Sequence, residues 1–207
     1  FQGSFRRRER KDAGRAAEDY GSIGRRIAAA ALPAILTGFA MQGSFILDQV
    51  LFMRLMPAGA DSAVQWGIYT GKYRILSSIP AMLTAAVCTG LIPSLSVSHT
   101  GMNPGRTREK AFLMLKLSLA LSLPFAVWSA VTADSLIPAL FTAGDMETAA
   151  RLLRLGCVSM VLQALAVGIA CILQGLGRER LLFIGAAVSL ILHTVLLSVL
   201  LHSLGMG

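Results

Sequence analysis

Five long apolar segments restrict the folds that this chain can adopt. They cover residues 27–53, 75–97, 112–132, 152–176 and 181–204, and each contains at least 21 residues. An α-helix rises about 1.5 Å per residue, so each segment is long enough to cross a hydrocarbon core roughly 30 Å thick. The alternation of apolar and polar residues that membrane strands require is missing. The sequence therefore predicts an all-α membrane protein with about five transmembrane helices.

The composition also favours a membrane protein over a soluble enzyme. The chain is 55% hydrophobic and only 14% charged, whereas soluble domains carry roughly 25% charged residues. A net charge of +8 would suggest nucleic acid in a soluble protein, but here the basic residues lie before and between the apolar segments. We therefore expect membrane lipids rather than nucleic acid as partners. The sequence has no catalytic motif, metal-ligand cluster or nucleotide-binding loop, so we expect neither catalysis nor a cofactor.

The positions of the basic residues predict how the chain is oriented. Residues 1–26 form a basic arm without apolar periodicity, and residues 27–204 form the transmembrane domain. If the arm is cytoplasmic, the inner side holds 14 Lys and Arg residues and the outer side holds 5. The positive-inside rule then places the N-terminus in the cytoplasm and the C-terminus outside. Because an odd number of spans ends here without a soluble tail, we expect a piece of a longer protein.

Polar residues gather on one face of the first apolar segment. With 100° per residue, Gln42, Ser44, Asp48 and Gln49 share that face. An Asp at the centre of a membrane helix costs roughly 2.5 to 3.5 kcal/mol, so such residues usually face a cavity or the interior of a bundle. Asp48 is only five residues from Met53, near the outer end, so an interfacial carboxylate is the alternative. We predict that these four residues line an aqueous cavity.

Further candidate residues lie on the later segments. Ser77 and Thr84 belong to a small and polar stripe that either lines the same cavity or allows close helix packing. Arg54 and Arg74 flank the outer loop, where they could bind a phosphate or anchor the chain at the interface. His193 lies within the last segment, where a hydrogen bond to a neighbouring helix and a proton relay are both open. The segment 57–72, which contains Trp66 and Tyr69, is expected to form an outer cap at the membrane interface.

Several short motifs resemble one family of membrane exporters. These are ALP at 31–33, ILD at 46–48, GIYTGKY at 67–73, IPAML at 79–83, GLIPSLS at 90–96 and ILQGLGR at 172–178. Together they resemble the second half of the stage V sporulation protein B and polysaccharide-exporter family. This family lies within the superfamily of multidrug, oligosaccharidyl-lipid and polysaccharide exporters, which also contains the lipid II flippases. The resemblance extends from residue 24 onward.

The resemblance implies a two-lobed transporter of the bacterial cytoplasmic membrane, with roughly twelve to fourteen helices. Its lobes would rock around a central cavity and carry a lipid-linked cell-wall or polysaccharide precursor to the outer leaflet. This chain would form most of the second lobe, and the absent N-terminal lobe would be its partner. The first two helices of each lobe line the cavity in this family, which assigns the polar faces described above to it. Ser189 and His193 depart from the family, which often has Lys and then Asn at these positions.

Two other functions remain open. A cation-coupled multidrug antiporter of the same superfamily would use Asp48 as a proton or sodium site, and aromatic residues around the cavity would favour it. A non-transporting helical scaffold would need no second lobe. Because Arg54 and Arg74 supply positive charge at the rim and aromatic residues are few, the sequence favours a pyrophosphate-linked saccharide as the substrate.

Overall fold

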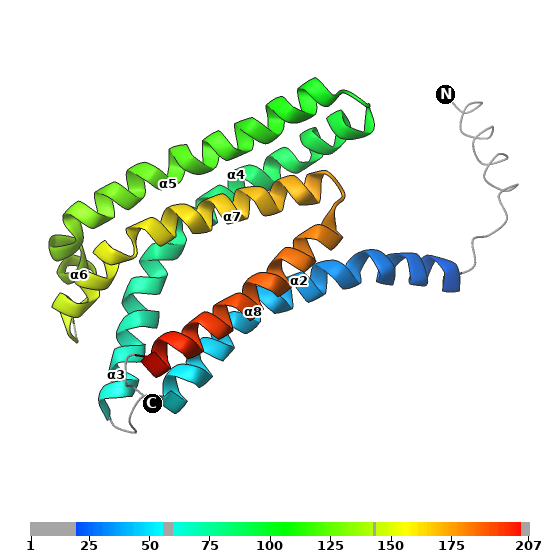
Figure 1. Ribbon diagram of the computed structural model, residues 1–207. Helices are drawn as coiled ribbons and strands as arrows, with labels where there is room; N and C mark the ends of the chain where they lie inside the picture. The colour runs from blue at the N-terminus through cyan, green and yellow to red at the C-terminus, as the bar shows by residue number, and fades with distance from the viewer. Residues whose placement is uncertain (1–19, 56–59, 143, 204–207) are drawn as a thin grey trace, which may run out of the picture.

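The computed structural model describes residues 20–55, 60–142 and 144–203. These residues are helical apart from short connections, and no β-strand occurs among them (Figure 1). The helices are α2 (Tyr20–Leu55), α3 (Ala60–Ile68), the π-helix η1 (Tyr69–Tyr73), α4 (Arg74–Thr100), α5 (Pro104–Leu140), α6 (Met146–Leu155), α7 (Cys157–Gly175) and α8 (Glu179–Ser203).

Four stretches of the described chain are long and apolar enough to cross a membrane. They are Ser62–Thr100, Pro104–Leu140, Cys157–Gly175 and Glu179–Val199. The first predicted segment, 27–53, falls within α2, which is not among these four stretches. Some side chains of α2 lie outside the part of the chain that the structure describes. An α-helix pairs its backbone groups internally, as a lipid environment demands, and the prolines inside α4 and α5 (Pro80, Pro93, Pro124 and Pro138) each remove one such bond. The predicted all-α membrane fold is confirmed.

Several helices extend beyond the apolar segments that predicted them. Helix α5 starts at Pro104, because the Asn103 side chain accepts a hydrogen bond from Arg106 N at 3.1 Å and proline suits the first helical turn. The basic residues expected in a loop before residue 112 therefore belong to the helix. Residues 1–19 of the predicted arm lie outside the described residues, and its last part, from Tyr20, belongs to α2.

The segment expected to form an outer cap is helical from Ala60 onward. Residues 57–59 lie outside the described part of the chain, but α3, η1 and α4 follow one another without a break up to Thr100. Trp66 of α3 contacts two rings of α2, with centroids 5.8 Å from Phe45 and 5.2 Å from Phe52. These contacts hold the 60–73 segment against α2, which explains why this segment is helical and not an irregular loop.

Helices α6 and α7 replace the single segment predicted at 152–176. The chain changes direction at Gly156, whose N–H donates to Leu152 O at 2.8 Å. A Cβ atom at this position would meet the Tyr73 hydroxyl oxygen at 2.2 Å. Glycine is therefore required for the approach of Tyr73, and the break between the helices lies where this contact forms.

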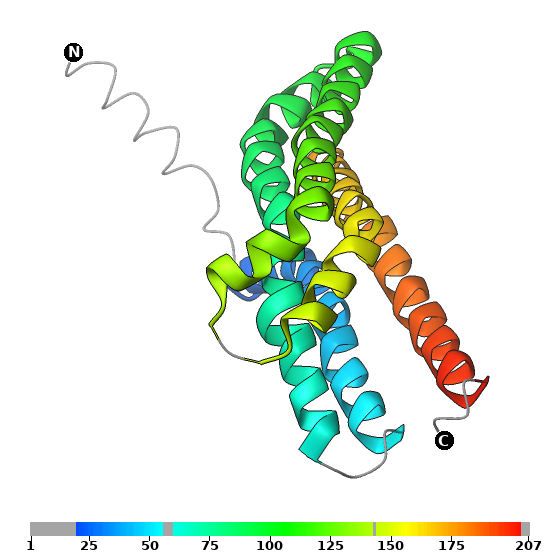
Figure 2. The same cartoon turned by 90° about the vertical axis from the view of Figure 1, so that its left-hand side faces the viewer.

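The helices pack in two groups. Helices α4, α5 and α7 pack against one another, and α2 runs alongside α8 (Figure 1). Small residues allow the close approach of the first group, since Gly168 of α7 faces the Ser118 side chain of α5. The α4–α5 and α7–α8 turns lie toward one end of the molecule, and α3 lies at the other end with the C-terminal parts of α2 and α8 (Figures 1 and 2).

Candidate functional site

A cavity of about 870 Å³ lies between the α2–α8 pair and the group formed by η1, α4 and α7. Side chains of α7 and α8 such as Ile169, Leu173 and Leu190 provide apolar surface. The polar and aromatic part of the wall consists of Ser44, Phe45, Asp48, Tyr69, Tyr73, Arg74, Ser77, Ser78, Ser159, Gln163, Ser189 and His193. The cavity is thus amphipathic and draws its lining from four helices and the π-helix.

A hydrogen bond between Asp48 and His193 joins the two helices on one side of the cavity. Asp48 Oδ1 lies 2.7 Å from His193 Nε2. The Asp48 side chain is 21% exposed and the His193 side chain is 47% exposed, so water can reach the pair. The contact is an ion pair when the imidazole is protonated and a hydrogen bond when it is neutral. The pair therefore links α2 to α8 at the cavity wall.

Arg74 brings a positive charge to the cavity wall beside Phe45, which lies about one helical turn before Asp48 on α2. Its guanidinium lies over the Phe45 ring, 3.7 Å from the centroid, which is cation–π geometry. It forms no ion pair with a carboxylate of the described residues. The hydroxyl of the preceding residue, Tyr73, lies 2.8 Å from Ser159 Oγ of α7, and this hydrogen bond fixes the tyrosine ring.

Aromatic rings form a column that reaches the cavity wall at Phe45, Tyr69 and Tyr73. Ring centroids are 5.2 Å apart between Phe52 and Trp66, 5.5 Å between Trp66 and Tyr69, and 5.5 Å between Tyr69 and Tyr73. We call these four rings, together with Phe45, the aromatic column. The sequence predicts few aromatic residues at the rim, and three of the residues lining the cavity, Phe45, Tyr69 and Tyr73, are aromatic. The spacing of 66, 69 and 73 on one helical face was the signal that could have revealed the column.

The predicted site residues fall into different places. Ser44, Asp48, Arg74 and Ser77 lie on the cavity wall. Gln49 and Arg54 are exposed and do not line the cavity, and the side chain of Gln42 lies outside the described residues. Arg54 and Arg74 therefore do not form the predicted basic pair on this wall.

Thr84 lies within helix packing and not on the cavity wall. Its side chain is fully buried, and its hydroxyl has no hydrogen-bond partner among the described residues. Ser77, seven residues earlier on the same face of α4, still reaches the cavity. Beyond Ser77 this face of α4 packs against α5 and α7, and Thr84 is therefore excluded from the cavity.

Sequence reasoning left His193 out of the predicted site, although it considered an interhelical hydrogen bond for this residue. It also left out Tyr73, Ser159 and Gln163, which line the same cavity. Nothing in the sequence indicates that α2 and α8 are neighbours, so the partnership of His193 with Asp48 requires the three-dimensional arrangement.

Comparison with known proteins identifies the family. The family model described as MatE matches residues 33–199, which is roughly four-fifths of the chain and includes every residue of the cavity wall. No curated protein matches the chain, and no solved structure does. The matched region contains the helices long enough to span a membrane as well as the cavity between them. The chain therefore belongs to the MatE family of membrane exporters.

Proposed function

We propose that this chain forms part of a flippase of the bacterial cytoplasmic membrane, which moves a lipid-linked saccharide by alternating access. The observation that carries the proposal is the amphipathic cavity, with Arg74 on its wall and no described carboxylate paired to it. Its volume of about 870 Å³ lies within the range of small-molecule sites and suits a saccharide headgroup. The lipid tail would remain among the exposed apolar helices.

The side chains on the wall have the chemistry that such a headgroup requires. Arg74 offers the planar fork of donors that binds phosphate oxygens in a bidentate manner. Hydroxyl and amide groups of Ser78, Ser159 and Gln163 can exchange hydrogen bonds with sugar hydroxyls. The Tyr69 and Tyr73 rings supply large, rigid apolar surfaces that end in a hydroxyl group.

No covalent step belongs to this proposal. The protein would bind the headgroup on one side of the membrane and release it on the other, so catalysis and a cofactor are not required. The Asp48–His193 pair would couple movement to the uptake or release of a proton. A second lobe, supplied by a longer chain or another chain, would provide the facing wall of the transport pathway.

A cation-coupled multidrug antiporter is the second candidate, and the aromatic column favours it. Stacked aromatic rings beside a carboxylate can hold an amphipathic organic cation. Two observations stand against this candidate. Asp48 already has His193 as its partner, and the positive charge of Arg74 on the same wall repels a cation.

Two arginine variants of the intact two-lobed protein distinguish the flippase from the multidrug antiporter. Arg74 lies on the cavity wall and Arg54 does not, so Arg54→Ala is a matched control for Arg74→Ala. Transport of a fluorescent lipid-linked saccharide into the outer leaflet of liposomes is measured, together with efflux of a lipophilic dye cation. We expect Arg74→Ala to lower saccharide transport at least about tenfold, the equivalent of one charge-assisted contact of 1.4 kcal/mol.

The control variant should transport the saccharide at nearly the wild-type rate. An antiporter would show a different pattern: dye efflux in the wild type, efflux retained or raised in Arg74→Ala, and no saccharide movement. That result would replace the flippase proposal with the antiporter. Movement of neither compound would favour a scaffold without transport activity.

A further inference from the structure

We propose that a basic pocket at the α7–α8 turn binds the phosphate group of an anionic membrane phospholipid, whose acyl chain lies along an exposed apolar stripe of α8. The pocket has a volume of about 370 Å³. It is lined by Ala29, Gly177, Arg178, Glu179, Arg180 and Leu181. Only Leu181 also lines the larger cavity, so this inference does not depend on the proposed transport function.

The turn that forms the pocket is held in a defined conformation. Gly177 has a φ angle of +65°, in the left-handed region that favours glycine. Its N–H donates to Gln174 O at 2.9 Å, and the N–H of Arg178 donates to Leu173 O at 2.9 Å. This is the hydrogen-bond pattern of a Schellman motif, which ends α7. It places Arg178 directly before α8 and Arg180 in its first turn.

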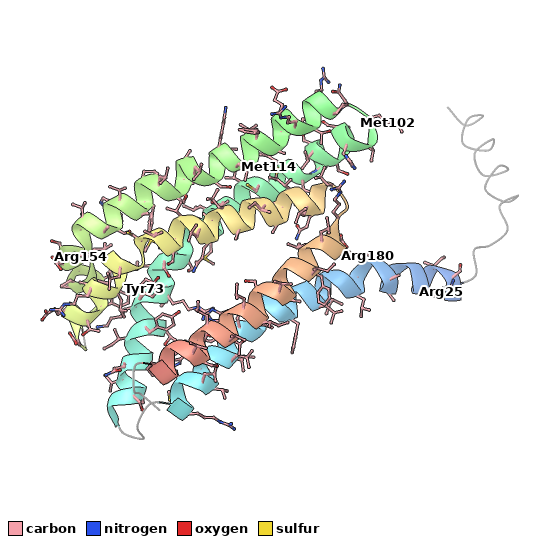
Figure 3. All side chains as sticks on the ribbon, in the orientation of Figure 1. Arg25, Tyr73, Met102, Met114, Arg154 and Arg180 are labelled. Carbon is pink, nitrogen blue, oxygen red and sulfur yellow. The ribbon has the colours of Figure 1, made fainter. Side chains whose placement is uncertain are left out.

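The charges of the pocket suit a phosphate. Arg178 and Arg180 are exposed, and neither forms an ion pair with a carboxylate of the described residues. Glu179 is the one acidic residue among the residues lining the pocket. Arg25 lies one helical turn before Ala29 on α2, toward the same end of the molecule as Arg180 (Figure 3). Guanidinium groups bind phosphate oxygens through paired, charge-assisted hydrogen bonds.

An apolar stripe begins at this pocket and indicates a lipid rather than a free phosphate. Its side chains recur at spacings of three and four residues, which places them on one side of α8. All are more than half exposed: Leu181 51%, Ile184 55%, Val188 58%, Ile191 65% and Val195 55%. Because Leu181 belongs to both the pocket and the stripe, a phosphate in the pocket directs an attached acyl chain along α8.

The position of the pocket agrees with this ligand. The apolar membrane-spanning stretch of α8 begins at Glu179, so the pocket lies where the hydrocarbon region meets the headgroups. Basic pockets between transmembrane helices at this depth are known to bind lipid headgroups. The phosphate and the chain of one phospholipid can therefore contact the protein at the same time.

Lipid titration of the 207-residue chain in detergent tests the inference, with bound phosphatidylglycerol counted by native mass spectrometry. The test variant is Arg178→Ala with Arg180→Ala. The control is Arg106→Ala with Arg108→Ala, which removes the same charge from exposed residues near the start of α5, at the same end of the molecule. Each arginine near a charged headgroup contributes about fivefold in affinity, so the test variant should lose about 25-fold and the control less than about twofold.

A third variant separates the shape of the pocket from its charge. Ala29→Phe fills the pocket and leaves every charge in place, so it should weaken phosphatidylglycerol binding while soluble glycerol phosphate remains a poor ligand. Equal losses in the test and control variants would show general surface charge and overturn the proposal. Equal binding of phosphatidylcholine, or of glycerol phosphate without acyl chains, would also overturn it.

Discussion

At the scale of single residues, Asp48 and His193 are 145 residues apart in sequence, and their contact connects α2 with α8. A carboxylate inside a membrane segment is costly, and this cost alone was enough to mark Asp48 as a candidate from the sequence. The identity of its partner could not be derived in that way, because it depends on α8 lying beside α2. The same limit applies to Tyr69 and Tyr73, whose place on the cavity wall depends on where the π-helix turns them.

Asp48→Asn tests whether the charge of this pair matters to transport. Asparagine keeps the shape and can still hydrogen-bond to His193, so stability should change by less than the roughly 0.6 to 2 kcal/mol of an interhelical hydrogen bond. Export by the intact two-lobed protein should fall at least about tenfold, because the carboxylate charge on the cavity wall is lost. Transport assays and thermal unfolding of the same preparations provide the two measurements.

Leu47→Asn is the control for that experiment. Leu47 is 37% exposed and does not line the cavity, so a polar side chain there should lower stability and leave the rate of export per folded molecule unchanged. Unchanged export in Asp48→Asn would remove Asp48 from the site.

Gly156→Ala tests the contact between the α6–α7 break and the cavity wall. The new Cβ atom would meet the Tyr73 hydroxyl oxygen at 2.2 Å, so the ring must move and its 2.8 Å hydrogen bond to Ser159 must break. We expect a loss of about 1 to 3 kcal/mol, typical of overpacking, measured as a lower midpoint of thermal unfolding. Gly90→Ala is the control, since nothing lies within 4 Å of its new Cβ atom and the helix gains in propensity. Similar midpoints for the two variants would contradict the predicted clash.

At the scale of helices, the apolar segments were recognisable because length and hydropathy are local properties. The elements that the sequence did not reveal depend on contacts between segments. The break at Gly156 reflects the approach of Tyr73, and the order of the 60–73 segment reflects the stacking of Trp66 on α2. Ser77 and Thr84 have the same pattern in sequence and different surroundings, because α4 runs from the cavity into the packed group with α5 and α7.

Lys72→Met tests what the buried ammonium of the π-helix contributes. Lys72 is 7% exposed. Among the described residues, its Nζ has two weak acceptors at 3.4 Å, the Asp145 carbonyl oxygen and the Met146 sulfur, and lies 6.0 Å from the Phe141 ring centroid. Burying a poorly compensated charge is costly, so an apolar side chain of similar length should leave the unfolding temperature equal or higher. Lys72→Ala should lower stability by about 1 to 3 kcal/mol, because it also removes the packed stem. Equal destabilisation by both variants would show that the charge itself stabilises the fold.

The start of α6 should be sensitive to acid through Asp145. A side-chain hydrogen bond from Thr148, aided by one from the Thr148 backbone N–H, holds the pKa of this exposed carboxyl below its ordinary value of 3.8. A lowered pKa means that its stabilising effect is present above pH 3.8 and is lost as the pH falls through the value in the folded protein. Amide hydrogen exchange in Met146–Leu155, corrected for intrinsic rates, should accelerate in that range.

Asp145→Asn provides the matched control for α6. Asparagine Oδ1 can still accept the capping hydrogen bond from the Thr148 N–H without titrating, whereas its Nδ2 cannot accept the one from the Thr148 hydroxyl. The acid-dependent acceleration should therefore disappear. If both proteins lose protection over the same pH range, another group causes the change.

At the scale of the whole molecule, the two ends of the bundle differ in how their basic residues are used. At the end with α3 and α6, Arg151 pairs with Glu147, Arg154 pairs with Asp134, and Lys72 is buried. At the other end, no described arginine of the α4–α5 and α7–α8 turns pairs with a described carboxylate. Arg54 is also exposed and without an ion pair among the described residues near the first end, but Arg106, Arg108, Arg178 and Arg180 make such side chains more numerous at the second end.

The sequence predicts that the α4–α5 and α7–α8 turns lie in the cytoplasm, and this orientation stays a prediction. Met102 of the α4–α5 turn is 90% exposed, and Thr142 lies in an exposed position between α5 and α6. We expect a membrane-impermeant thiol reagent to label Thr142→Cys in intact cells and to label Met102→Cys only after the membrane is opened. Both variants also carry Cys157→Ser, because Cys157 is only partly buried and could react with the reagent. Cys88 and Cys171 are buried and stay in place. If only Met102→Cys were labelled in intact cells, the orientation would be the reverse of the predicted one. The lipid pocket of the α7–α8 turn would then lie at the outer leaflet.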